Sequence, residues 1–275
     1  MINEHEFYEG KFVYTEKWTK ANYFLSLIYQ KLARQRLFNR YIPVKKEQKI
    51  LDIGCGGGNE LFIQKGTVTG LDISKKSLVR AANIYSKTIF ASVTLIPERD
   101  CQYDFVVSAD VLGHIKDNEK DKTIGEIYRV LKPGGKTLHY IEVDGTNLLL
   151  KFAKKYPALY RKYFVDQDGH IGLESINDNV ARFTKAGFKQ IKAIPLYKLP
   201  FNTDEFLKRF DNEYKKKSFF IRAGVGLAEV TNKTKYLKLL VNLSGGLVFD
   251  FISIFLPKSS AGGLFLVASK SKMKN

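Results

Sequence analysis

The amino-acid sequence predicts an α/β protein with a doubly wound, mostly parallel sheet. Short apolar strands alternate with helices over most of residues 46–197, and this alternation favours a parallel sheet covered by helices on both faces. A glycine-rich turn directly follows the first strand, as is usual in sheets of this class. Because crossover connections between parallel strands are right-handed, a doubly wound sheet is the commonest of the remaining topologies.

Seven strands are expected from short apolar stretches that end in polar or glycine-containing turns. Their ranges are 49–53, 68–72, 90–95, 103–108, 137–143, 188–196 and 263–268.

Helices are expected where apolar residues recur every three or four positions. Their ranges are 15–41, 75–85, 118–131, 148–163 and a further helix that ends at Gly187. Ser74 is placed to cap the second of these helices. The sequence Pro133-Gly134-Gly135 stops the third one.

The strand and helix pattern divides the chain into a core and two helical additions. Residues 1–45 are expected to form an N-terminal helical cap. The core comprises residues 46–197 and 262–270. Residues 198–261 read as a helical insertion before the last strand, with a role in ligand binding, membrane-surface contact or dimerisation left open.

The composition describes a basic protein with an ample core. The hydrophobic fraction is 44%, and the two cysteines, Cys55 and Cys101, offer no disulfide framework. The first twenty residues contain four glutamates and no apolar run, so we expect a cytoplasmic protein, with the inner face of the membrane as the other option. The net charge is +17, and residues 151–275 contribute +13 of it (23 Lys and Arg against 10 Asp and Glu). A basic half attracts nucleic acid, anionic lipid or an acidic substrate, although it is equally compatible with a simple lysine-rich surface.

The strongest motif is Asp52-x-Gly54-x-Gly56-x-Gly58, which lies between a strand and a helix. Glycine is needed where the chain turns sharply and its backbone approaches a ligand closely. The amides at the start of the following helix suit a carboxylate. Asp72 follows at the carboxyl end of the second strand, where a carboxylate can accept hydrogen bonds from both hydroxyls of a ribose.

A dinucleotide-binding fingerprint fits this turn less well. The pattern G-x-G-x-x-G/A places Asn59 at its third position when it starts at Gly54, and Leu61 when it starts at Gly56. Neither frame has the required small residue. The sequence therefore favours a nucleoside other than a nicotinamide or flavin dinucleotide.

Three stretches together resemble the class I S-adenosylmethionine-dependent methyltransferases, a Rossmann-like family that includes quinone-biosynthesis enzymes. Residues 50–58 (ILDIGCGGG) resemble the family's first motif, residues 103–115 (YDFVVSADVLGHI) its fourth strand, and residues 126–135 (EIYRVLKPGG) the turn before its fifth strand. Residues 262–268 are similar to its last strand. The resemblance implies a seven-stranded sheet with an antiparallel last strand, and S-adenosylmethionine as the cofactor.

The same resemblance implies which residues bind the cofactor. Asp52, Gly54, Cys55, Gly56 and Gly58 would line the methionine and ribose, Asp72 would bind the ribose hydroxyls, Ile73 and the pair Ser92 and Val93 would contact the adenine, and Ser108 and Ala109 would face the methionine. Ser92 departs from the family pattern, because many relatives carry an aspartate there.

Methyl transfer from a sulfonium needs alignment above all, and a base only where the acceptor must lose a proton. The candidates are His170, in a segment where the family often builds its acceptor site, and His114. Packing beside the sheet is the alternative role for His114. The group Asp166, Asp168 and His170 is interpreted as polar residues of a turn, and no metal is expected. Tyr14 and Trp18 lie in a segment that could close over the cofactor as a lid.

The acceptor is expected to be a small molecule, a glycan or a lipid-linked compound, methylated on oxygen. The sequence lacks the Asn/Asp-Pro-Pro-Tyr/Phe motif of DNA amino-methyltransferases. RNA methylation and non-catalytic S-adenosylmethionine binding are the alternatives. Residues 239–256 are strongly apolar and are flanked by lysines, so the stretch 236–258 would contact a membrane peripherally, pack in the core or form a homodimer contact. Asp250 and Gly245-Gly246 argue against a spanning helix.

Overall fold

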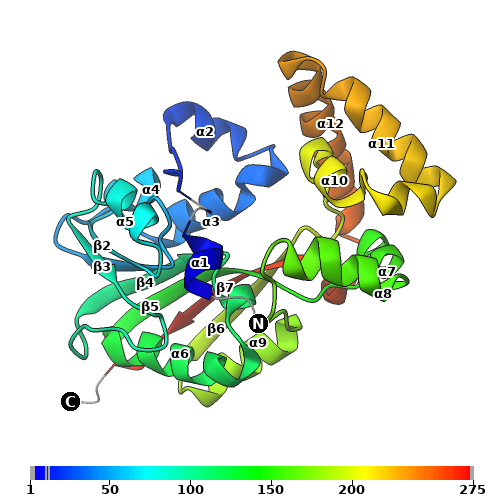
Figure 1. Ribbon diagram of the computed structural model, residues 1–275. Helices are drawn as coiled ribbons and strands as arrows, with labels where there is room; N and C mark the ends of the chain where they lie inside the picture. The colour runs from blue at the N-terminus through cyan, green and yellow to red at the C-terminus, as the bar shows by residue number, and fades with distance from the viewer. Residues whose placement is uncertain (1–3, 10, 12, 273–275) are drawn as a thin grey trace.

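The computed structural model describes residues 4–9, 11 and 13–272, and its centre is one seven-stranded sheet (Figure 1). The strand order is β3-β2-β1-β4-β5-β7-β6. The strands are β1 (Lys49–Ile53), β2 (Thr67–Asp72), β3 (Lys87–Phe90), β4 (Tyr103–Ala109), β5 (Leu131–Glu142), β6 (Lys189–Leu196) and β7 (Gly263–Ser269).

β7 is the only one of these strands that runs in the opposite direction to the others. It lies between β5 and β6, with Leu266 opposite His139 on one side and Ala193 on the other. The doubly wound sheet with an antiparallel last strand is therefore confirmed. β7 contains six buried residues in succession, as expected for a strand that is covered on both faces.

Helices cover both faces of the sheet and extend beyond one end of it (Figure 1). They are α1 (Glu4–Tyr8), α2 (Lys20–Leu25), α3 (Ala33–Tyr41), α4 (Glu60–Ile63), α5 (Lys75–Ala81), α6 (Asp117–Val130), α7 (Leu148–Lys154), α8 (Pro157–Tyr160), α9 (Ile176–Lys185), α10 (Thr203–Phe210), α11 (Phe219–Thr231) and α12 (Lys235–Ser253), with short turns η1 (Gln30–Leu32), η2 (Leu112–His114), η3 (Arg161–Asp166), η4 (Glu213–Lys216) and η5 (Lys258–Ser260). α3, α4 and α5 bury Phe38, Phe62 and Leu78 against one face. α6 and α9 bury Ile127 and Phe183 against the other.

Two of the predicted helices are interrupted. The range 15–41 contains α2, η1 and α3, and the chain is extended up to Trp18 before Thr19 caps α2 by accepting a hydrogen bond from Asn22. The range 148–163 breaks at Tyr156, where Pro157 begins α8. Proline restricts the preceding residue to non-helical conformations but is well suited to the first turn of a helix.

The third strand lies earlier than the sequence predicts. β3 ends at Phe90, and the chain then turns because the Ser92 hydroxyl accepts a hydrogen bond from the Thr94 amide. A serine that bonds locally to the backbone competes with strand pairing.

The segment predicted as an insertion forms a helical layer beside the sheet. α10, η4 and α11 share a small core with α7 and η3, in which Phe164, Phe210 and Tyr214 are buried. Figure 1 shows α11 and α12 projecting together away from the sheet. Within the described residues, α12 is the one helix whose length and hydropathy would allow it to cross a membrane.

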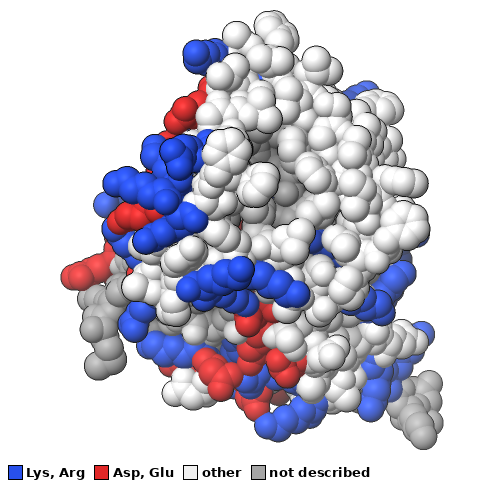
Figure 2. Space-filling model, turned by 90° about the vertical axis from the view of Figure 1, so that its right-hand side faces the viewer, with Lys and Arg blue, Asp and Glu red and all other residues white. Residues whose placement is uncertain are grey.

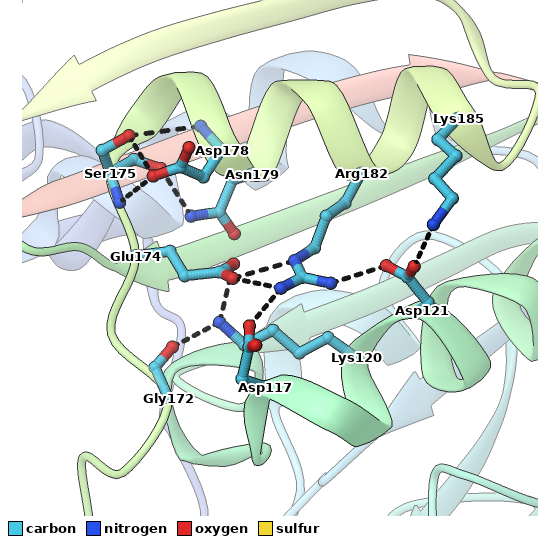
Figure 3. Close-up of polar contacts among 10 residues, drawn as sticks. All are labelled: Asp117, Lys120, Asp121, Gly172, Glu174, Ser175, Asp178, Asn179, Arg182 and Lys185. Carbon is cyan, nitrogen blue, oxygen red and sulfur yellow. Dashed lines mark hydrogen bonds and ion pairs between the residues drawn. The ribbon is translucent and has the colours of Figure 1, made fainter.

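An ion-pair cluster holds the loop between His170 and α9 in place (Figure 3). The Lys120 side chain is only 2% exposed and lies 2.8 Å from the Glu174 carboxylate, and it also donates to the carbonyl of Gly172. Arg182 donates to the same carboxylate at 2.5 Å and pairs with Asp117 at the surface. Glu174 thus ties α6 and α9 to the loop that follows His170.

We expect Glu174→Gln to lower the free energy of unfolding by about 3 kcal/mol, because the buried Lys120 ammonium would lose its counterion. Asp117→Asn is the control: this acid also pairs with Arg182, but its side chain is 78% exposed, so the loss should stay within about 0.5 kcal/mol. Urea unfolding of both variants measures the difference. Equal losses would show that the buried pair has no special importance.

Candidate cofactor and acceptor site

The glycine-rich turn after β1 has a left-handed backbone. Gly54, Gly56 and Gly58 have φ values of 61°, 53° and 88°, a region that side chains rarely adopt. A Cβ on Gly54 would also lie 2.4 Å from a methyl group of Val111. The glycines therefore let the turn pack against the segment after β4. The helix that follows, α4, has only four residues and is capped by Asn59, which accepts the Leu61 amide.

Asp72 lies beside this turn at the end of β2. One carboxylate oxygen accepts the Gly56 amide and the other accepts the Ser74 amide, both at 2.8 Å. Burial raises the pKa of Asp72. A largely buried carboxylate with two backbone donors retains acceptor capacity, which the two hydroxyls of a ribose would use. The residue therefore fits its predicted role, and Ile73 directly follows it.

Asp52 is buried at the other side of the turn. It accepts a hydrogen bond from the Tyr85 hydroxyl at 2.7 Å, and the same hydroxyl accepts the Asn59 amide. Burial raises the pKa of Asp52 to about 8, against the opposing effect of the Tyr85 hydrogen bond. The Cys55 thiol is also buried, which raises its pKa. The structure therefore brings Asp52, Cys55 and Asp72 together around one turn.

The other predicted cofactor contacts lie in different surroundings. Ser108 is fully buried and shares a 2.7 Å hydrogen bond with His139, while Ala109 ends β4. Val93 is buried in the hydrophobic core, and Ser92 bonds to Thr94. The inward position of Ser108 and Val93 would leave mainly their backbone atoms for a ligand.

The N-terminal segment lies directly over the glycine turn. The Thr15 hydroxyl donates to the Gly57 carbonyl, and the Glu16 amide donates to the Gly58 carbonyl, each at 2.8 Å. A Cβ on Gly57 would lie 2.4 Å from the Tyr14 carbonyl oxygen. Tyr14 is exposed beside the turn, whereas Trp18 is buried in the core. The segment thus lies against the glycine turn, and its role as a lid stays a prediction.

An ion-pair network continues from this segment to the end of β4. Glu16 and Asp110 both pair with Arg34, and Asn59 donates to Glu16 at 2.8 Å. Asp110 has a positive φ of 59°. Its burial raises its pKa to about 7 despite the Arg34 charge, which acts in the opposite direction. Sequence reasoning missed Arg34 and Glu16, because no local motif marks them.

A second group of polar side chains lies where β4 and β5 end. His170 pairs with Glu142 through Nε2, while its Nδ1 lies 3.1 Å from the Phe164 carbonyl. His114 Nδ1 lies 2.9 Å from the Gly169 carbonyl, and the two imidazole rings are 4.8 Å apart. The structure therefore brings both predicted histidines together and adds Glu142, which the sequence did not single out.

The two histidines differ in their pKa shifts. Burial lowers the pKa of His114, and the charge of His170 lowers it further. Burial also lowers the pKa of His170, but the hydrogen bond to Glu142 together with the charges of Glu142 and Asp168 raises its pKa overall. The pKa values of the two neighbouring imidazoles are thus shifted in opposite directions. His114 is half-buried, whereas His170 is buried.

These side chains could also hold a metal ion. One ligand atom from each of His114, Glu142 and His170 lies within 4.8 Å of the others, and two histidines with one carboxylate is a known ligand set for divalent metals. Asp168 does not join them, because it pairs with Arg209 and, at 3.1 Å, with Lys208 of α10. The sequence cluster Asp166, Asp168 and His170 therefore does not converge.

Comparisons with known proteins agree with the fold and the cofactor turn. Residues 51–139 match the family described as a methyltransferase domain. This region is a methyltransferase domain. The match contains the glycine turn and Asp72, so the class I resemblance is confirmed and S-adenosylmethionine is the cofactor of the family to which the domain belongs.

Individual relatives cover only part of the chain. A ubiquinone biosynthesis O-methyltransferase of Pseudomonas entomophila is 35% identical over 137 residues, which are 42% of this chain and 58% of that protein. A tRNA (carboxymethyluridine(34)-5-O)-methyltransferase of Arabidopsis thaliana is 30% identical over 149 residues, 52% of this chain and 36% of the relative. The matched regions thus span 58% and 36% of these two relatives.

A solved structure supports the fold alone. Phosphoethanolamine N-methyltransferase 2 of Haemonchus contortus, crystallised with S-adenosyl-L-methionine, has a TM-score of 0.56 and 20% identity, covering 99% of this chain and 61% of that one.

We expect Asp72→Ala to weaken S-adenosylmethionine binding about a hundredfold, because two hydrogen bonds to a carboxylate, each contributing about 1.5 kcal/mol, would be lost. Asp104→Ala is the control, since Asp104 also accepts a backbone amide, that of Lys49, but at the opposite edge of the sheet. Titration calorimetry measures both affinities. An unchanged affinity of the Asp72 variant would contradict the site.

Proposed function

We propose that the protein transfers the methyl group of S-adenosylmethionine to a hydroxyl oxygen of a small molecule, a glycan or a lipid-linked acceptor. The observation that carries this proposal is the group of His114, His170 and Glu142. It lies at the same edge of the sheet as Asp72, because the ends of β2, β4 and β5 meet there. Ligands of open α/β sheets bind at this carboxyl edge.

The donor would be held by the glycine turn and Asp72. A bound S-adenosylmethionine supplies an already activated methyl group, so the protein has to align the acceptor and exclude water. The strap of residues 13–18 covers the turn and contributes to that exclusion.

A hydroxyl acceptor also has to lose its proton. His114 suits this task, because its lowered pKa keeps the imidazole neutral at physiological pH. His170 acts as a positioning residue. It pairs with Glu142 through Nε2, and its charged form lowers the pKa of the adjacent His114. An amine acceptor would need such a base less, which is why we favour oxygen.

RNA is the second candidate acceptor. The Arabidopsis relative is named as a tRNA methyltransferase, and the second half of the chain carries a net charge of +13. RNA binding through phosphates would weaken steeply with added salt. A protein that binds the cofactor without turnover is the third candidate.

Incubation with radiolabelled methyl donor and fractionated cell extract tests the proposal. We expect label in a lipid, glycan or small-molecule fraction, in a linkage stable to base as an ether is. Label in RNA would favour the second candidate. Cofactor binding without label in any fraction would contradict methyl transfer.

We expect His114→Gln to lower kcat by about a hundredfold or more, the usual contribution of a general base, with little change in cofactor affinity. In the unsubstituted enzyme the rate should fall as the pH drops through a value below 6.5, because protonated His114 cannot accept a proton. The variant should lose this acid limb. A limb that persists in the variant would assign it to another group.

Treatment with a chelator distinguishes a general-base role of His114 from a metal-binding role of His114, Glu142 and His170. If the proposal holds, dialysis against EDTA leaves the rate unchanged. Loss of activity that added divalent metal restores would instead assign the three side chains as ligands.

A further inference from the structure

We propose that α11, α12 and residues 23–28 form a surface that docks the protein on an anionic lipid bilayer. The proposal stands on the exposed side chains of this region and does not depend on the acceptor. The region is called the apolar surface below.

The first observation is that α12 has its apolar residues on the outside. Its two buried residues are Asn242 and Gly246. Asn242 is bonded to Thr203 in both directions, and Asp250 accepts a 2.6 Å hydrogen bond from Gln30. Polar residues of α12 thus face the rest of the protein, and its apolar residues face outward. A surface helix in water normally has its apolar residues toward the protein and its polar residues toward the solvent.

The neighbouring α11 is apolar on two faces. Ile221, Val225 and Ala228 are buried in the helical layer. Phe220, Leu227 and other large side chains on the remaining face are exposed. The apolar residues on the first face of α11 are therefore buried in the protein's own core, whereas those on the second face have no such cover among the described residues.

Exposed apolar side chains gather in this region. Of the 26 large hydrophobic side chains that are exposed in the described residues, 14 fall between residues 219 and 255 and four more between 23 and 28. Figure 2 shows the resulting face, whose upper part is broad, uncharged and hollowed, with Lys and Arg and some Asp and Glu along its borders. Apolar patches of this extent mark a surface that contacts a partner or a membrane.

Charge favours an anionic bilayer as the partner. Residues 214–249 contain seven Lys and Arg but one acid, Glu229, and residues 17–40 contain six Lys and Arg but no acid. Lys215 and Lys238 are paired with aspartates, and Arg34 is paired with Glu16 and Asp110. The rest give the apolar surface a basic border, which attracts anionic headgroups.

A second copy of the chain fits this surface less well. A twofold dimer brings the same patch of each protomer together, so the basic borders would face one another. Like charges opposed across an interface are unfavourable.

The strand order requires α12 to lie on the membrane surface, because a helix that crossed the bilayer would separate β7 from β5 and β6. α12 has 19 residues, about 28 Å, which approaches the hydrocarbon thickness of about 30 Å. However, β7 follows α12 and pairs with β5 and β6, which precede it. Both ends of α12 must therefore lie on one side of a bilayer. α11 has 13 residues, about 20 Å, and is too short to serve as a returning span.

The apolar surface lies close to the carboxyl edge of the sheet. A cavity of about 280 Å³ lies where η1 and α3, the end of β6 and α12 meet. Its lining residues include Gln30, Arg36, Tyr197 and Asp250. Tyr197 directly follows β6 at the carboxyl edge of the sheet. The cavity thus lies between the apolar surface and the carboxyl edge of the sheet.

Vesicle sedimentation of the full chain tests the proposal. We expect binding to vesicles of phosphatidylcholine and phosphatidylglycerol in equal parts, and weaker binding to phosphatidylcholine alone or at high salt. Phe220→Glu with Leu240→Glu, at side chains 84% and 64% exposed, should lower partitioning about tenfold or more, because apolar insertion is lost. Val44→Glu with Val79→Glu, 69% and 73% exposed elsewhere, carries the same charge change and should bind normally.

A probe at the surface provides a second readout. Leu240→Cys in a Cys101→Ser background, labelled with a polarity-sensitive dye, should shift to shorter emission wavelength on anionic vesicles, whereas Val79→Cys should not. No sedimentation with anionic vesicles, an equal loss in both double variants, or a dimer in light scattering that the Phe220 and Leu240 variant alone abolishes would overturn the proposal.

Discussion

The carboxylate of Asp72 joins two parts of the cofactor site, because one oxygen accepts the Gly56 amide and the other accepts the Ser74 amide. This arrangement requires the turn after β1 to bend back toward β2, which the left-handed glycines allow. The turn in turn forms the surface on which residues 14–16 lie. From there the Glu16, Arg34 and Asp110 network reaches the end of β4. The glycine turn and the end of β4 are thus connected through one continuous set of polar contacts.

A second constraint comes from the last strand. β7 has to enter between β5 and β6, so the chain after β6 must leave the sheet and return to the same edge. The intervening residues form α10, α11 and α12, of which α10 and α11 pack on α7 and η3. The same detour brings Lys208 and Arg209 to Asp168, two residues before His170. The helical layer therefore supports the histidine segment while presenting its apolar surface outward.

Much of the fold was predictable because it depends on local signals. The glycine turn, the Ser74 cap and the apolar strands each have a pattern of a few adjacent residues, and the structure contains them, although the third strand, β3, lies earlier than predicted. The break of the first helix was not predictable, because it depends on pairing of residues 15–16 with a turn more than forty residues away. Glu142 and Arg34 were missed for the same reason. Their partners, His170 and Asp110, are distant in the sequence, so only the folded chain shows the pairs.

The glycine turn and Asp72 together are proposed to hold a nucleoside that carries a methylsulfonium group. This binding mode can be tested with a crystal structure of the full chain grown with S-adenosylhomocysteine. We expect the ribose hydroxyls within hydrogen-bond distance of the Asp72 carboxylate and the amino-acid part of the ligand against Gly54 and Gly56. A turn that stays empty at saturating ligand, or one that instead binds a dinucleotide, would contradict it.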